Sequence, residues 1–280
     1  MNNLVRRTIT GAYIVILTLG GFWLHPVSFV ITGLIILSGT QYEYYQMIRN
    51  TGARPQIVPG FIAGIVTYAI ATLIASDILH PRYFLVLIPV MLAIMIAELY
   101  RKQEKPFDSL AHTFFSVLYS AVPVSMIPFS AFERTGLPSI LHHGTLVFSP
   151  GIIIGFFILL WVNDSGAYLT GTAFGKHRLM ERISPKKSWE GFFGGMILSA
   201  AVAWFISGWL GVVDRNKWVV ISLIISIAGT YGDLLESMLK RSMGVKDSGS
   251  VMPGHGGFLD RFDSALISFP LVFLFISLFG

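Results

Sequence analysis

A single polar stretch near the C-terminus, residues 237–263, contains most of the residue types that could do chemistry. It carries basic side chains, carboxylates and a histidine among several glycines, and the sequence on either side is strongly apolar. Phosphates are bound by positive charge and closely approaching backbone N–H groups, and hard divalent cations are bound by carboxylate oxygens. The stretch is therefore typical of a site for phosphate and metal, with the candidates Ser237, Lys240, Arg241, Lys246, His255, Gly256, Gly257, Asp260, Arg261 and Asp263.

Helical spacing extends this site upstream to Asp233. Positions 233, 236, 237 and 240 are three or four residues apart, so a helix would place all of them on one face. Glu236 and Lys240 could simply form an ion pair with each other and have no functional role. Such a pair would leave Asp233 unexplained, which favours Asp233 as a functional residue.

A second helix is expected to begin near Phe258, after two consecutive glycines. Asp260 and Asp263 would then share a face in its first turn. Each carboxylate alone could be explained by the favourable field at a helix N-terminus. Their occurrence in tandem, with Asp233 on the preceding helix, is better explained by a metal-binding cluster.

Two further groups precede this region. Asn163 and Asp164 follow the apolar run 152–162, where Asp164 could either face a polar cavity or cap a helix. The segment 184–191 contains Lys187, Ser188 and Glu190 just before an expected helix start, which suits phosphate binding. Its two lysines could equally serve only as a cationic anchor at the membrane surface.

The composition indicates that the surroundings of these residues are membrane helices. The 280 residues are 54% hydrophobic and 12% charged, whereas a soluble domain has about 25% charged residues. There is no cysteine, so disulfides and thiolate ligands are excluded. The net charge of +5 fits cationic loops beside anionic lipid, and without a soluble module we expect no nucleic acid partner.

The hydropathy pattern predicts an all-α, polytopic membrane protein with about nine transmembrane helices. With the N-terminus in the cytoplasm, sixteen lysines and arginines fall in cytoplasmic segments and four fall outside. Glycines four apart at 60 and 64, at 151 and 155, and at 191 and 195 would allow close helix–helix contacts, although glycine is also common in any membrane helix. The apolar runs are 9–24, 27–39, 57–76, 83–99, 110–130, 150–163, 191–210, 217–234 and 264–280.

The polar stretch resembles the signature of phosphatidate cytidylyltransferases, also called CDP-diacylglycerol synthases. The matching pattern is Ser-x-hydrophobic-Lys-Arg, four residues, Lys-Asp, then Pro-x-His-Gly-Gly, a hydrophobic residue, and x-Asp-Arg-hydrophobic-Asp. Every fixed position is present, and Met252 is a soft departure that concerns packing. Residues 164–168 and 184–191 are also similar to the family, with Ser188 where threonine is frequent. The specific motifs cover about 163–264, whereas the first 150 residues agree in hydropathy alone.

The resemblance implies a reaction of phosphatidate with CTP that gives CDP-diacylglycerol and pyrophosphate and requires Mg²⁺. We expect two cation positions, of which one is for Mg²⁺. The resemblance also implies a bacterial inner-membrane protein, often homodimeric, with lipid-facing helices in 1–150 and a catalytic part in 151–280. Asp233 and Asp260 would be the leading metal ligands, with Asp263 and Asp164 beside them. The expected phosphate-binding residues are Lys187, Lys240, Arg241, Lys246 and His255, with Ser188 and Glu190 at the nucleotide end.

Two other classes of protein remain as alternatives. An ion-coupled transporter also has many spans and buried carboxylates, but here the charges gather on one side without paired broken helices. A CTP-dependent enzyme that acts on another lipid or polyprenol phosphate is poorly separated by sequence. A CDP-alcohol phosphotransferase is disfavoured because its Asp-Gly-x-x-Ala-Arg motif is missing.

Overall fold

The computed structural model describes residues 3–49, 51–135, 145–245, 248–249 and 256–279, with side chains in the first helix from residue 10 onward. It divides into two compact units. The first contains Met1–Pro150 and Ser248–Leu259, and the second contains Gly151–Asp247 and Asp260–Gly280. The signature stretch is thus shared along the chain between the two units.

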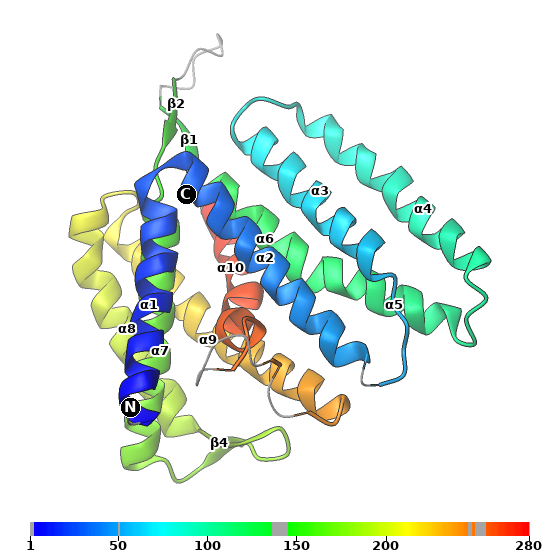
Figure 1. The fold of residues 1–280 in the computed structure, drawn as a ribbon. Helices are drawn as coiled ribbons and strands as arrows, with labels where there is room; N and C mark the ends of the chain where they lie inside the picture. Colours follow the sequence, from blue (N-terminus) through cyan, green and yellow to red (C-terminus); the bar gives the residue numbers. More distant parts are fainter. Residues whose placement is uncertain (1–2, 50, 136–144, 246–247, 250–255, 280) are drawn as a thin grey trace. The chain divides into compact units, whose positions relative to one another are not determined.

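The first unit is a helical assembly with one small hairpin. Polar side chains are buried among its apolar helices; examples are Gln41 and Glu43 on α2 and Thr113 on α5. The elements, labelled in Figure 1, are α1 (Asn3–Leu24), α2 (Pro26–Arg49), α3 (Ile57–Ala75), η1 (Pro81–Val86), α4 (Leu87–Tyr100), α5 (Pro106–Ser116), the π-helical turn η2 (Val117–Ala121), α6 (Val122–Met126), η3 (Ile127–Ser130) and the antiparallel strands β1 (Phe132–Thr135) and β2 (Thr145–Phe148).

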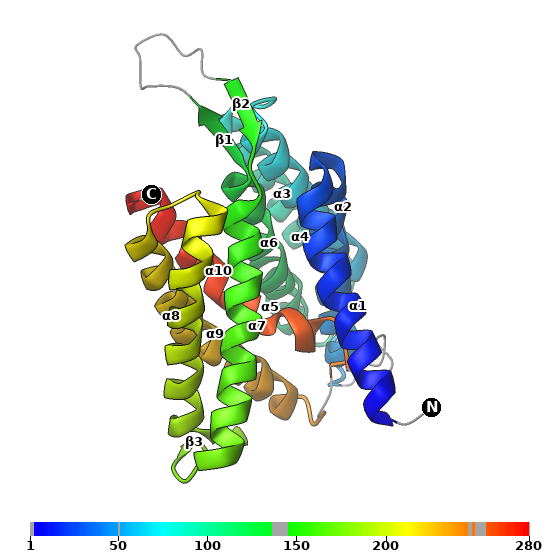
Figure 2. The same ribbon diagram turned by 90° about the vertical axis from the view of Figure 1, so that its left-hand side faces the viewer.

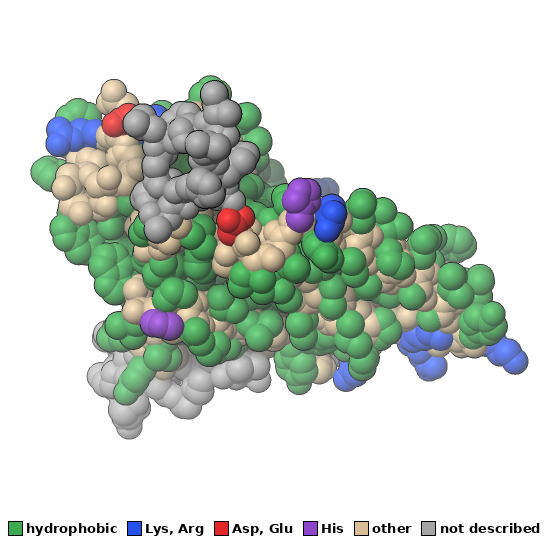
Figure 3. All heavy atoms as spheres, turned by 90° about the horizontal axis from the view of Figure 1, so that it is seen from above, with side chains coloured by type: hydrophobic (Ala, Val, Ile, Leu, Met, Phe, Trp, Pro, Cys, Tyr) green, Lys and Arg blue, Asp and Glu red, His purple; other side chains and the backbone are tan. Residues whose placement is uncertain are grey.

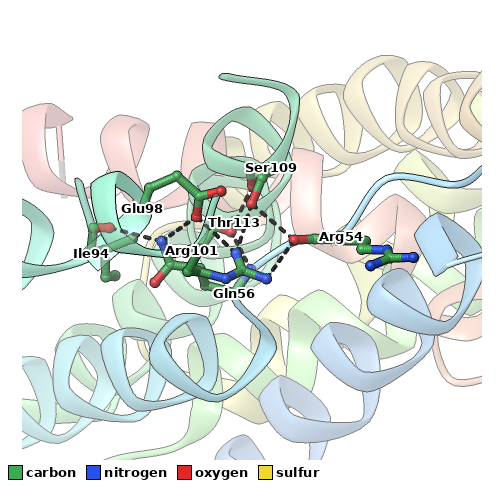
Figure 4. A network of polar contacts seen from close by, with 7 residues as sticks. All are labelled: Arg54, Gln56, Ile94, Glu98, Arg101, Ser109 and Thr113. Atoms are coloured by element: carbon green, nitrogen blue, oxygen red, sulfur yellow. Dashed lines mark hydrogen bonds and ion pairs between the residues drawn. The ribbon is translucent and has the colours of Figure 1, made fainter. Parts of the chain in front are cut away.

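A buried polar network joins α4, α5 and the segment before α3 (Figure 4). Glu98 is 3% exposed and accepts hydrogen bonds from Gln56 Nε2 at 2.6 Å and Arg101 Nη1 at 2.8 Å. Arg101 also donates to Ser109 Oγ and to the carbonyl of Arg54, both at 2.9 Å. Glu98 therefore has a cation and an amide donor within the first unit, which satisfies an otherwise costly buried carboxyl group.

The second unit consists of long helices around an aromatic core. Phe156 and Phe157 of α7 meet Phe269 and Phe262 of α10 edge-on, with ring centroids 5.1 and 6.1 Å apart. The elements are α7 (Gly151–Phe174), the antiparallel strands β3 (Arg178–Met180) and β4 (Ser184–Ser188), α8 (Trp189–Leu210), α9 (Arg215–Ser242) and α10 (Leu259–Phe279, whose first residue belongs to the first unit).

Helices α7 and α8 lie side by side over most of their lengths (Figure 2). A side-chain Cβ at Gly195 would lie 2.6 Å from the carbonyl oxygen of Asn163, and one at Gly191 would lie 2.8 Å from that of Ala167. Such distances leave no room for any side chain. The close contact predicted from the glycine spacing is confirmed.

The described part of the chain contains seven helices that are long and apolar enough to cross a membrane, so this is a polytopic integral membrane protein. Each of the nine apolar runs overlaps a helical segment. The described apolar part of α1, Thr10–Leu24, is shorter than the 18 residues required of a span, and α2 is not among the seven. Figure 3 shows hydrophobic side chains over most of one face. The seven are Ile57–Ala75, Pro81–Tyr100, Pro106–Ser130, Gly151–Phe174, Trp189–Leu210, Arg215–Ser242 and Leu259–Phe279.

Helix α7 settles one alternative left open by the sequence. It continues without a break from Gly151 to Phe174, so Asn163 and Asp164 lie near its middle and cap no helix end. An acidic side chain in the middle of a membrane helix is costly unless it has a polar partner. Asp164 therefore belongs among the functional candidates.

Candidate functional site

The candidate site is built along one face of α9. Helical spacing brings Ser237 onto Asp233, where the hydroxyl donates to Oδ1 at 3.3 Å, and brings Lys240 onto Glu236. The common face expected from the sequence is confirmed. The residues around it form two groups: the Asp233 cluster (Asp164, Lys187, Asp233 and Asp263) and the Lys240 cluster (Glu236, Lys240 and Asp260).

In the Lys240 cluster one lysine joins two carboxyl groups. Lys240 Nζ lies 2.5 Å from Glu236 Oε2 and 2.6 Å from Asp260 Oδ1. Their side chains are well shielded, with exposed fractions of 13% for Lys240, 1% for Glu236 and 10% for Asp260. The expected Glu236–Lys240 pair is present, but it is not isolated. Lys240 also contacts Asp260 and so links the start of α10 to α9.

In the Asp233 cluster a lysine from the β3–β4 hairpin reaches α9. Lys187 Nζ lies 2.9 Å from Asp233 Oδ2, and both side chains are partly exposed. The hairpin makes this contact possible, because Lys187 lies in β4 directly before α8. A cation–carboxylate contact across elements is inconsistent with Lys187 serving only as an anchor at the membrane surface.

Two more carboxyl groups belong to the Asp233 cluster. Asp263 on α10 is buried, accepts a hydrogen bond from the Ser264 amide at 2.6 Å, and interacts electrostatically with Asp233, Asp164 and Lys187. Asp164 on α7 interacts with Lys187, Asp233 and Arg261. Three acidic side chains from three helices thus surround one lysine. Such an arrangement repels itself unless further positive charge is bound.

The residues expected at the nucleotide end have local structural roles. Ser188 is buried and caps α8, accepting the Gly191 amide at 3.2 Å. Glu190 accepts the backbone amide of His177 and lies 2.6 Å from its Nδ1. Both residues therefore fix the turn from the hairpin into α8, which positions Lys187 beside them.

The remaining predicted site residues lie at the ends of these helices. Arg241 is exposed in the last turn of α9, and Arg261 is exposed in the first turn of α10. Gly257 is buried in the first unit, and Gly256 has a φ of +80°, a conformation that favours glycine. Lys246 and His255 lie outside the described residues.

The donor set suits a magnesium ion that is shared with substrate. Among the described residues there is no group of three or more His, Cys, Asp or Glu side chains that could hold a metal ion by itself. Magnesium is usually bound by one or two carboxylates together with water and substrate phosphates, and rarely by a cage made of protein alone. The two or three mutually repelling carboxyl groups around Asp233 fit that mode of binding.

Sequence reasoning missed two acidic residues. Glu236 was explained by its pairing with Lys240, yet its Oε1 has no hydrogen-bond partner among the described residues. Glu43 was not singled out at all, although it is 1% exposed on α2. The available signal was a charged residue immediately after an apolar run, in the sequence Gln41-Tyr-Glu-Tyr-Tyr45.

Comparison with known proteins gives consistent results. A phosphatidate cytidylyltransferase of Staphylococcus aureus (strain COL) is 45% identical over 126 residues, which are 43% of this chain and 46% of the relative. The phosphatidate cytidylyltransferase of Staphylococcus epidermidis (strain ATCC 12228) is 44% identical over 122 residues, which are 43% of this chain and 46% of the relative. That of Staphylococcus haemolyticus (strain JCSC1435) is 39% identical over 173 residues, which are 61% of this chain and 60% of the relative.

The matched stretch thus spans about half the length of the first of these relatives. The model of the cytidylyltransferase family, in contrast, matches residues 5–279. That range includes every candidate residue discussed above and almost all of the helices. The chain belongs to the cytidylyltransferase family.

Proposed function

We propose that this protein transfers CMP from CTP to phosphatidate, forming CDP-diacylglycerol and releasing pyrophosphate. Family membership supports the use of a cytidine nucleotide, and the names of the relatives support phosphatidate as the acceptor. The apolar helices support a lipid substrate, because its acyl chains can remain in the bilayer while its headgroup reacts.

The observation that carries this proposal is the Asp233 cluster. Three acidic side chains converge on one lysine, and α9, which contributes Asp233, also carries Lys240 and Arg241 in its last turn. CTP and phosphatidate are both strongly anionic, so their approach requires neutralising charge. A site with excess carboxylates and nearby lysines can recruit a divalent cation and still contact phosphate oxygens directly.

Asp233, Asp263 and Asp164 are the proposed residues for Mg²⁺, and Asp260, which belongs to the Lys240 cluster, is the proposed ligand at a second cation position. When bound, Mg²⁺ would lower the repulsion between the two substrates and stabilise charge on the leaving pyrophosphate. Ser237 and Lys187 orient Asp233 through its two oxygens, at 3.3 and 2.9 Å. Lys240 holds Asp260 in the same way.

The chemistry requires no nucleophile from the protein. A phosphate oxygen of phosphatidate forms a bond to the α-phosphorus of CTP. The bond from that phosphorus to the oxygen between the α- and β-phosphates breaks, and the β- and γ-phosphates leave as pyrophosphate. The attacking phosphate is already ionised at neutral pH, so no proton must be removed. The contribution of the chain is alignment and charge neutralisation by Lys187, Lys240 and Arg241.

The distribution of basic residues supports a bacterial inner membrane with the site on the cytoplasmic side, where CTP is found. The second unit carries the Lys/Arg-rich segment 176–187 and the pair Lys240-Arg241. Cytoplasmic loops are enriched in such residues. The same rule places the N-terminus in the cytoplasm.

The direct test is transfer of label from CTP to lipid. The purified full-length chain should convert phosphatidate and α-labelled CTP to a labelled liponucleotide only when Mg²⁺ is present. Asp233→Asn and Asp263→Asn should each lower turnover by about 100- to 1,000-fold, the range found when a charge-stabilising group is removed. Asp214→Asn is the matched control, because that side chain is 84% exposed and lies 3.9 Å from Lys217.

Measuring the free energy of unfolding of each variant separates a loss of turnover from a loss of folded protein. The Lys187–Asp233 pair is partly exposed, so its loss should lower the free energy of unfolding by less than about 1 kcal/mol. Near-normal turnover of Asp233→Asn would contradict the proposed metal site. A polyprenol phosphate that is used in preference to phosphatidate would favour the other CTP-dependent class, and no product with any lipid would favour a carrier.

A further inference from the structure

Glu43 on α2 makes long-range contacts with the signature stretch. Its Oε2 accepts a hydrogen bond from Ser248 Oγ at 2.9 Å and from the Leu259 amide at 2.8 Å. These partners are 205 and 216 residues away in the sequence. All three residues belong to the first unit, and Glu43, Ser248 and Leu259 are buried. A single carboxyl group therefore joins both ends of the segment Ser248–Leu259 to one helix.

Two glycines of the signature make room for this carboxyl group. A Cβ at Gly249 would lie 2.7 Å from Glu43 Oε1, and the nearest atom to a Cβ at Gly257 would be Glu43 Oε2 at an even closer approach. One turn earlier on α2, a Cβ at Gly39 would lie 2.7 Å from the ring of Phe258. A side chain at Gly249 or Gly257 would therefore displace the carboxyl group of Glu43, and one at Gly39 would displace the ring of Phe258.

We propose that Glu43 is a positioning residue that holds Ser248 and Leu259 against α2 and thereby fixes the start of α10. Leu259 is the first residue of α10, and its amide would otherwise be one of the unpaired donors at the helix N-terminus. Asp260 follows Leu259 directly in the chain, and Asp263 follows one turn later. A shift of this backbone displaces both proposed metal ligands. The catalytic consequence rests on the proposed function, whereas the structural consequence does not.

Glu98 provides a matched control within the same unit. It is 3% exposed, compared with 1% for Glu43, and it also accepts two hydrogen bonds from different elements. Its partners Gln56 and Arg101, however, lie directly before α3 and directly after α4 (Figure 4), and within the described part of the chain it has no hydrogen bond to the signature stretch. If Glu43 were only a buried structural glutamate, substitutions of Glu43 and Glu98 should therefore have the same effects.

The first measurement is amide hydrogen exchange in the purified full-length protein, which needs no substrate. Glu43→Ala should speed exchange in the segment that contains Leu259 by roughly 10- to 100-fold, because a buried donor loses its acceptor. Glu98→Ala should leave exchange in this segment unchanged. Equal acceleration in the two variants, or none in Glu43→Ala, would overturn the proposal.

The second measurement is steady-state kinetics with CTP and phosphatidate. A loss of folded protein would lower the apparent kcat and leave KM for CTP unchanged. A displaced segment should also raise KM for CTP, because Gly256 and Gly257 are expected to approach its phosphates. We expect kcat/KM to fall by about 100-fold in Glu43→Ala, as found for small misplacements of reacting groups.

A conservative variant keeps the proposal testable if Glu43→Ala does not fold. Glu43→Gln retains the volume and one acceptor oxygen but loses the negative charge, so its hydrogen bonds to Ser248 and Leu259 should be weaker. Relative to wild type it should speed exchange at Leu259 and raise KM for CTP, by less than alanine does. Glu98→Gln is the corresponding control and should behave as wild type in both assays. If wild type makes no liponucleotide, the proposed function fails and hydrogen exchange alone decides the role of Glu43. If Glu43→Gln and Glu98→Gln are equally impaired, the role of Glu43 is purely structural.

Discussion

Lys240→Met tests whether the Lys240 cluster is a structural link between α9 and α10. The substitution keeps most of the side-chain volume and removes the ammonium group. In the structure that group lies 2.5 Å from Glu236 and 2.6 Å from Asp260, with all three side chains no more than 13% exposed. After the substitution both acidic side chains lose their shared cation in a poorly solvated site.

The expected magnitude follows from burial. Removing one partner of a buried ion pair costs about 3–5 kcal/mol, because the remaining charge is left uncompensated. Lys240→Met should therefore lower the free energy of unfolding by about 3–5 kcal/mol. The matched control is Lys217→Met on the same helix. Its pair with Asp214 is long, at 3.9 Å, and exposed, so the loss should be below about 1 kcal/mol.

The free energies can be measured from unfolding in mixed micelles of mild detergent and SDS, followed by tryptophan fluorescence. A double variant, Lys240→Met with Glu236→Leu, should recover part of the loss, because an apolar replacement of a buried ion pair is often tolerated. The reasoning is refuted if Lys240→Met loses less than about 1 kcal/mol, or if the double variant is no more stable than the single one.

Two further substitutions probe the supporting structure. Gly195→Ala should destabilise the protein by about 1–3 kcal/mol, the usual cost of overpacking, because its Cβ would collide with the backbone of α7; Gly208→Ala on the same helix has open space and should be neutral in the same unfolding assay. Arg101→Met removes the cation beside Glu98 and should lower the free energy of unfolding by roughly 1–3 kcal/mol, less than for a fully buried pair because Arg101 is 29% exposed. The control is Lys105→Met, which should not change the unfolding midpoint because Lys105 is exposed.

Local periodicity explains the part of the structure that the sequence predicted well. The face shared by Asp233 and Lys240 depends only on helical spacing, and α9 is helical throughout this region. The start of α10 near Phe258 follows from the preceding glycines, and the structure begins that helix at Leu259. The glycines at 191 and 195 predicted the close contact of α8 for the same reason. Each inference used residues within one or two turns of each other.

The features that the sequence could not supply depend on distant packing. The β3–β4 hairpin is short and polar, so no periodic pattern marks it, yet it brings Lys187 to Asp233. From the sequence Asp164 could either face a polar cavity or cap a helix, because polar residues follow an apolar run, and only the continuation of α7 excludes the cap. Glu43 has partners more than 200 residues away, and nothing near it in the sequence identifies them.

The two clusters suggest how one site can be both stable and reactive. The Lys240 cluster is shielded and links α9 with α10, so its lysine is already engaged by protein carboxyl groups. The Asp233 cluster is more open and has more acidic groups than cations, so it has reason to bind a divalent ion and, through it, phosphate. Asp260 and Asp263, three residues apart on α10, contribute one carboxyl group to each cluster. The position of α10 therefore governs both clusters together, and the contact that fixes its first residue affects the chemistry without touching a substrate.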